Sequence, residues 1–139
     1  MFKLMRYTIL GVEIDPITRV VATNRIKHWL AEQPSQPKTL FTPNPEILTY
    51  AQSHPPYQAI LNAGNLNVAD GIGVVWLSSH ILPERITGAD MVQTIIQEGK
   101  ERQLSIGVVL KKTSLSRAQD LPGMITTHDR FNQVPDIVL

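Results

Sequence analysis

The chain has 139 residues, of which 42% are apolar and 18% charged, and its net charge is +1. This length suits one domain with a substantial core, and the balanced charge excludes recruitment of nucleic acid or an anionic membrane by bulk electrostatics. The absence of cysteine excludes disulfides, thiolate zinc sites and cysteine nucleophiles, and it fits a reducing cytoplasm. No run of roughly eighteen uncharged apolar residues occurs, so we expect any membrane contact to be peripheral.

Strand and helix signals alternate from the start of the chain. Residues 7–14 are rich in β-branched side chains and predict a strand, after which Asp15 and Pro16 supply a helix cap and a first-turn proline. The helix should reach about Glu32 before the polar loop 33–37. Its apolar side chains are spaced to share one face: Ala22, Ile26, Trp29 and Leu30.

The cap-and-proline signal recurs after a short predicted strand at 38–42. Asn44 and Pro45 predict the start of a second helix, and His54 followed by two prolines predicts its end. The next apolar runs predict a short helix at 57–63, a buried strand at 66–69 and an apolar helix at 73–81.

The second half of the chain continues the alternation. Thr87 and Asp90 form a capping box for a helix to about Arg102, and residues 104–110 are continuously apolar, as buried parallel strands are. Beyond them we expect a basic loop, a strand near 124–127 and an apolar strand in the closing PDIVL. The basic loop carries Lys111, Lys112 and Arg117. An apolar strand that ends a chain uncovered indicates a core truncated at its C-terminal end.

This order of elements predicts an α/β fold, Rossmann-like, with one mostly parallel sheet and flanking helices, in a single domain spanning residues 1–139. Ligands in such folds bind at the carboxyl ends of the strands. Two polar turns belong at that edge, one at 42–46 and the other at 70–73.

Asp70 is the first candidate for chemistry. It follows an apolar strand and precedes Gly71 and Gly73, where the backbone allows close approach of a ligand. An ionised carboxylate there can act as a general base toward a hydroxyl group. The alternative is that Asp70 only caps the following helix, which is the commoner role of such an aspartate.

Thr42, Asn44 and Glu46 form the polar turn of the neighbouring strand. Spacing alone favours a structural role, in which Asn44 caps the helix and Glu46 complements its dipole. The functional alternative is that Thr42 and Asn44 bind a sugar. Arg85 precedes a helix N-terminus and would suit a diphosphate, unless it only pairs with Glu84 or Asp90 at the surface.

The sequence lacks the motifs of several common cofactor sites. Gly71 and Gly73 lack the third glycine of a dinucleotide fingerprint, since position 76 is Trp, and no phosphate-binding P-loop occurs. The four histidines are scattered, and no D-x-D pair is present to hold a divalent cation. We therefore expect neither a metal nor a cofactor.

Three segments in order, TPNPEIL, ADGIGVVW and ERITGADMV, resemble the WecG/TagA/CpsF family of bacterial glycosyltransferases. The likeness extends from Tyr7 to Arg102 and returns in VPDIVL. It implies an inverting, metal-independent transfer of N-acetylmannosamine, or a related sugar, from a UDP donor. It also implies an acceptor of N-acetylglucosamine on undecaprenyl diphosphate, a place in the cytoplasm at the membrane face, and self-association.

The resemblance assigns roles to the candidates. Asp70 matches the proposed base and Arg85 the arginine proposed to meet the diphosphate, while Thr42 and Asn44 match the polar pair of the same pocket. The substrate-binding set is completed by the glycines of the D-G-x-G motif, Gly71 and Gly73. The loop KKTSLSRAQD departs from the family, and a later G-x-P-x-Q-E segment is missing. The alternatives are an inactive nucleotide-sugar-binding module and a truncated fragment.

Overall fold

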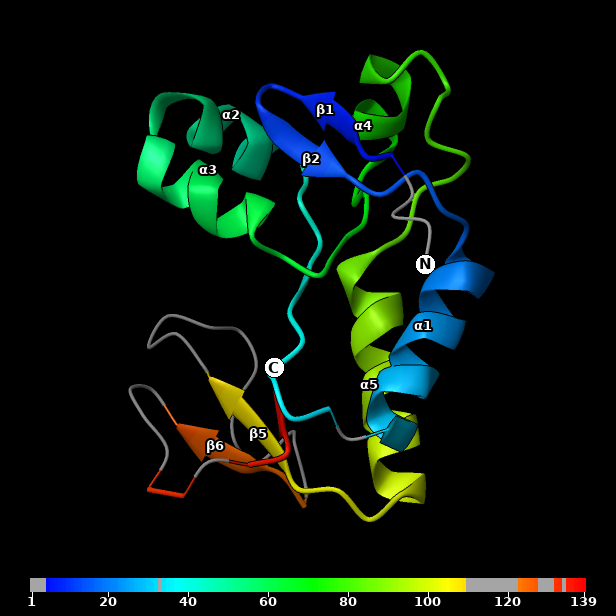
Figure 1. Ribbon diagram of the computed structural model, residues 1–139, viewed down its shortest axis with the longest axis vertical. Coiled ribbons are helices and arrows are strands. Elements are labelled where there is room, and N and C mark those ends of the chain that lie inside the picture. Colours follow the sequence, from blue (N-terminus) through cyan, green and yellow to red (C-terminus); the bar gives the residue numbers. More distant parts are fainter. Residues whose placement is uncertain (1–4, 33, 110–122, 128–131, 134) are drawn as a thin grey trace. The chain divides into compact units, whose positions relative to one another are not determined.

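The computed structural model describes residues 5–32, 34–109, 123–127, 132–133 and 135–139 (Figure 1). The chain divides into two compact units, Met1–Met91 and Val92–Leu139. The basic loop with Lys111, Lys112 and Arg117 lies outside the described residues.

The order of elements follows the predicted alternation of strands and helices. The first unit contains β1 (Tyr7–Ile9), β2 (Val12–Ile14), α1 (Arg19–Glu32), β3 (Leu40–Phe41), α2 (Pro45–Ser53), α3 (Pro55–Asn62), β4 (Leu66–Asn67), α4 (Ile72–Leu77) and the start of α5 (Gly88–Glu101). The second unit contains the rest of α5, β5 (Ile106–Val109), β6 (Ile125–Thr127) and β7 (Ile137–Val138).

Most of the strand pairs are parallel, which confirms the predicted α/β class. β3 pairs in parallel with β4, and β5 lies between β6 and β7 and is parallel to both. The sheets are smaller than expected, because the described strands form three separate sheets. One of these is the antiparallel pair of β1 and β2.

The prediction of one strand over residues 7–14 was wrong. The segment is a hairpin in which Tyr7 lies opposite Ile14. Leu10 and Gly11 both have positive φ, 48° and 83°, as the two-residue turns that match strand twist require. Gly11 was the available signal, because glycine adopts this conformation without steric cost.

The predicted start of the first helix was also wrong. α1 begins at Arg19, and the hydroxyl of Thr18 accepts the N–H of Val21 at 3.3 Å. The end at Glu32 is as predicted. Asp15 does not cap this helix, because its carboxylate is buried in another contact.

Local signals located the starts of α2 and α5. Asn44 Oδ1 accepts the N–H of Ile47 at 2.8 Å at the start of α2, and Thr87 Oγ1 accepts that of Asp90 at 3.1 Å at the start of α5. α4 is shorter than predicted and ends at Leu77. Ser79 and His80 have φ of 53° and 63°, a left-handed conformation that cannot continue a right-handed helix.

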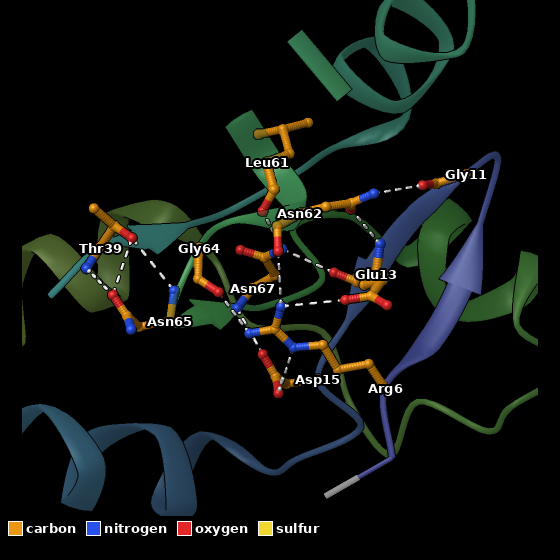
Figure 2. A network of polar contacts seen from close by, with 10 residues as sticks. All are labelled: Arg6, Gly11, Glu13, Asp15, Thr39, Leu61, Asn62, Gly64, Asn65 and Asn67. Atoms are coloured by element: carbon orange, nitrogen blue, oxygen red, sulfur yellow. Dashed lines mark hydrogen bonds and ion pairs between the residues drawn. The ribbon is translucent and has the colours of Figure 1, made fainter. Parts of the chain in front are cut away.

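A buried ion pair joins the start of the chain to the hairpin (Figure 2). Arg6 Nε lies 3.2 Å from Asp15 Oδ1, and the two side chains are only 9% and 5% exposed. Arg6 Nη2 also donates to the carbonyl oxygen of Gly64 at 2.7 Å. The other oxygen of Asp15, Oδ2, accepts the backbone N–H of Asn67 at 2.8 Å.

Asn67 extends this network to α3 and β2 (Figure 2). Its side-chain nitrogen Nδ2 donates to the carbonyl oxygens of Glu13 and Leu61, both at 2.8 Å. A side chain at Gly64 would collide with Asn67 Oδ1. The network therefore fixes the hairpin, the end of α3 and the start of β4 to one another.

The first unit also has an apolar core. Figure 1 shows α2 and α3 beside the β1–β2 hairpin, with which both are in contact. The buried members of the core are Ile9, Val12, Ile14, Leu48, Ala51, Leu61, Ala69, Val74, Val75 and Leu82.

A side-chain clip aligns two strands of the second unit. Asp136 Oδ2 accepts both the N–H and the hydroxyl of Ser105 at 2.7 Å, and Ser105 Oγ accepts the N–H of Asp136 at 2.9 Å. The backbone N–H of Ile137 then donates to the Ser105 carbonyl at 3.0 Å. These bonds set the register of β7 against β5.

Replacing Asp15 by Ala should lower the free energy of unfolding by about 3–5 kcal/mol, because it leaves the buried guanidinium of Arg6 without its counter-charge. Chemical denaturation followed by circular dichroism measures the change. The matched control is Arg19→Ala, which removes the exposed Arg19–Asp90 pair at 3.2 Å and should cost less than about 1 kcal/mol. Equal losses in the two variants would contradict the structural role of Asp15.

The clip predicts a pH dependence. The hydroxyl and then the backbone N–H of Ser105 lower the pKa of Asp136 below its ordinary value of 3.8. Because the folded-state pKa is the lower one, the clip stabilises the fold above pH 3.8 and this contribution is lost as the pH falls through the folded-state pKa. An NMR titration of the Asp136 carboxyl carbon should give a midpoint under 3.8 that rises in Ser105→Ala. An identical midpoint in both proteins would refute the clip.

Candidate functional site

Backbone pairing continues past β3 and β4 and brings two candidate residues to neighbouring positions. The N–H of Val68 donates to the carbonyl of Phe41, and the N–H of Asp70 to that of Pro43, both at 3.0 Å. Thr42 therefore lies on one backbone and Asp70 on the next, at the carboxyl ends of a parallel pair. This is where ligands bind in α/β folds.

The segment that leads into α5 lies on the other side of Asp70. The N–H of Ile86 donates to the carbonyl of Ala69 at 2.8 Å. Two residues later the N–H of Gly88, the first residue of α5, donates to Asp70 Oδ2 at 2.9 Å. The carboxylate is therefore held at the N-terminus of α5, a helix that begins eighteen residues further along the chain.

The expectation that Asp70 caps the helix directly after it was wrong. The cap residue of α4 is Gly71, which makes no side-chain hydrogen bond there. Asp70 instead accepts a hydrogen bond from the first residue of the distant helix α5, and 26% of its side chain remains exposed. One carboxylate oxygen is thus engaged with the backbone, while the side chain remains accessible to solvent.

Arg85 lies beside the other oxygen of this carboxylate. Its Nη2 atom is 3.7 Å from Asp70 Oδ1, and the Arg85 side chain is 53% exposed. The expected surface partners of Arg85 interact elsewhere: Glu84 accepts the N–H of Arg19, and Asp90 pairs with the guanidinium of Arg19. A pair this long and exposed contributes little to stability, so the guanidinium can be drawn to a stronger anion.

Gly88 makes room for the two polar side chains. A Cβ atom on this residue would lie 2.9 Å from Thr42 Oγ1 and 3.4 Å from Asp70 Oδ2. Glycine at this position lets the hydroxyl and the carboxylate approach the start of α5 together. The sequence analysis missed Gly88, although it follows the capping Thr87, and the ITGAD segment marked a helix start there.

The remaining candidates adjoin this group through Pro45. Built Cβ atoms on Gly71 and Gly73 would lie 3.1 Å and 3.5 Å from the Pro45 ring. Gly71 has a φ of 128°, which residues with a side chain rarely adopt. Asn44 precedes this proline, and its Oδ1 is occupied by the cap of α2. A substrate contact from Asn44 would have to use its amide nitrogen.

The described residues contain no group of three or more histidine, aspartate or glutamate side chains close enough to hold a metal ion. What they bring together is a carboxylate, an arginine, a threonine hydroxyl and a helix N-terminus. A carboxylate can take a proton from a hydroxyl group, and a guanidinium with helix N–H groups can stabilise a leaving phosphate.

Comparison with known proteins gives two findings. A family model described as the glycosyl transferase WecG/TagA/CpsF family matches residues 7–120. The N-acetylglucosaminyldiphosphoundecaprenol N-acetyl-beta-D-mannosaminyltransferases of Staphylococcus aureus strains NCTC 8325 and COL are each 35% identical to this chain over 92 residues. The matched region is 64% of this chain and 36% of each relative, so the chain spans little more than a third of their length.

Gly88→Ala should destabilise the fold by about 1–3 kcal/mol, because the new methyl group overpacks against the Thr42 hydroxyl. The loss should shrink in a Thr42→Ala background, where that oxygen is absent. Thermal unfolding of the two single variants and the double variant measures the coupling between them.

A matched control is Gly73→Ala, whose Cβ would make only an ordinary contact of 3.5 Å with Pro45. It should change stability by less than about 1 kcal/mol. Strict additivity of Gly88→Ala and Thr42→Ala would contradict the described packing.

Proposed function

The chain belongs to the WecG/TagA/CpsF family of glycosyl transferases, and we propose on this premise that it carries part of the active site of an N-acetylmannosaminyltransferase. The donor is a UDP-sugar, and the acceptor is N-acetylglucosamine linked to undecaprenyl diphosphate. The matched relatives, which are named for transfer to such an acceptor, support this assignment. The family match spans residues of both compact units, which supports one catalytic domain.

The observation that carries the proposal is the meeting of Asp70, Arg85 and Gly88 at the end of β4. These residues come from two of the three motifs that resemble the family, and the structure brings them within hydrogen-bond or ion-pair reach. Thr42 from the remaining motif is packed against the same point.

Asp70 acts as the general base. Gly88 orients the carboxylate through Oδ2, and Oδ1 takes the proton from the acceptor hydroxyl. The freed oxygen attacks the anomeric carbon of the donor from the face opposite UDP. The bond between that carbon and the phosphate oxygen breaks, UDP leaves with its electron pair, and the configuration at the sugar inverts.

Arg85 receives the leaving diphosphate. The diphosphate of the donor carries two negative charges and attracts a guanidinium more strongly than one exposed carboxylate does, so donor binding moves Arg85 away from Asp70 Oδ1. The same movement frees the base. In this scheme an arginine and the N-terminus of α5 stabilise the leaving group, and transfer proceeds without a metal. Thr42 and Asn44 contact the sugar, and Gly71 and Gly73 allow its close approach.

With this acceptor, sugar transfer takes place at the cytoplasmic face of a membrane. Undecaprenyl diphosphate is a lipid, while sugar nucleotides are water-soluble. The chain accordingly acts as a peripheral protein at this face.

Asp70→Asn should reduce sugar transfer by about 10²–10⁴-fold, because the amide keeps the shape of the side chain and the bond to Gly88 but cannot accept the proton. Transfer of labelled sugar from the UDP donor to a lipid-linked N-acetylglucosamine acceptor measures the rate. The matched control is Asp90→Asn, which alters an exposed carboxylate in the first turn of α5 and should retain turnover within about twofold.

Unchanged turnover in Asp70→Asn would remove the mechanism. Calorimetry with UDP distinguishes the alternative of a binding module, for which the wild-type chain binds UDP and transfers no sugar.

A further inference from the structure

The segment after the candidate base exposes an unusual amount of apolar surface. Residues 71–83 contain no aspartate, glutamate, lysine or arginine. Four large apolar side chains of this segment are more than half exposed: Ile72 at 54%, Trp76 at 65%, Leu77 at 59% and Ile81 at 52%. We refer to these four, of which three belong to α4 and Ile81 follows its end by four residues, as the α4 apolar face.

This exposure is not needed to hold α4 in place. The helix is already anchored by Val74 and Val75, which are buried members of the core. A surface helix normally turns polar side chains toward water, whereas Ile72 and Trp76 lie one helical turn apart on the open side of α4. Exposed apolar groups gathered in this way mark interaction surfaces.

We propose that the α4 apolar face inserts into the surface of the lipid bilayer that carries the acceptor. The inference rests on the proposed function, because the relatives are named for an acceptor attached to diphosphoundecaprenol, the diphosphate of a long polyprenyl alcohol. The diphosphate and sugar of such a molecule lie at the membrane surface and its hydrocarbon lies in the bilayer. A protein that works on the sugar needs its active site at that boundary.

The position of the face in the chain fits this occupant. α4 begins two residues after Asp70, so at most about 7 Å of extended chain separates the candidate base from the start of the helix. Interfacial helices bury their apolar side by roughly 5–10 Å. Insertion of α4 therefore keeps Asp70 at the depth of the lipid headgroups, where the acceptor hydroxyl lies.

The side chains also indicate how the contact forms. Tryptophan favours the boundary between lipid and water. Because the segment has no lysine or arginine, binding comes from apolar burial and not from attraction to anionic lipid. No helix in the described ranges is both long and apolar enough to cross a bilayer.

The two tryptophans of the chain allow a specific test. In Trp29→Phe the only tryptophan is Trp76, and its emission should shift to the blue when phosphatidylcholine vesicles are added. Lipids brominated on the acyl chain should quench it. The matched control is Trp76→Phe, which leaves Trp29 in α1 and should show neither effect.

Ile72→Gln combined with Leu77→Gln should lower the vesicle partition coefficient by about tenfold or more, because two large side chains lose their apolar contact with lipid. The binding of the wild-type chain should change little between low and high salt and between neutral and anionic vesicles. Circular dichroism of the double variant confirms that its fold is intact.

Unshifted Trp76 emission would overturn the inference. Concentration-dependent self-association that the double variant abolishes would also overturn it, because the α4 apolar face would then contact a second copy of the chain.

The vesicle measurements contain no sugar donor, so they test the inference separately from the proposed function. Transfer to a short-chain, water-soluble acceptor without vesicle binding overturns only the inference, and vesicle binding without any transfer overturns only the proposed function.

Discussion

The buried carboxylate of Asp15 is the constraint on which the first unit depends. One of its oxygens neutralises Arg6 and the other accepts the backbone N–H of Asn67. The Asp15 side chain thus accepts a hydrogen bond from β4 that a backbone carbonyl oxygen would accept in an ordinary strand pair. Removing an ionised group from water costs several kcal/mol unless its partners are complete. The cost is met only when the start of the chain, the hairpin and β4 are all in place, which makes their arrangement cooperative.

The candidate site inherits its geometry from this network. Asn67 is the last residue of β4, and Asp70 follows three positions later. The backbone between them is buried and hydrogen-bonded to the segments on both sides. An error in the position of β4 would move the Asp70 carboxylate relative to Gly88, so the ion pair near the start of the chain and the candidate site at the strand end are parts of one structure.

Sequence reasoning located the helix caps of α2 and α5, whose partners are local, but it missed the equally local turn at Gly11 and it failed where the partner is distant. The caps of α2 and α5 were predictable because Asn44 and Thr87 bond to groups three residues away. The role of Asp15 was not, because its partner Asn67 lies 52 residues along the chain. The carboxylate of Asp70 was recognised as a candidate, but the helix that holds it was identified incorrectly, since short-range rules favour the helix that follows immediately.

Pro45 gives two motifs a shared boundary. Its ring occupies the first position of α2 and lies against the turn that opens α4, where a Cβ on Gly71 would be 3.1 Å away. The turn after β3 and the turn after β4 therefore contact each other through this proline ring. A side chain at Gly71 would press against the proline ring at the start of α2, so a variant at Gly71 calls for a compensating change at Pro45.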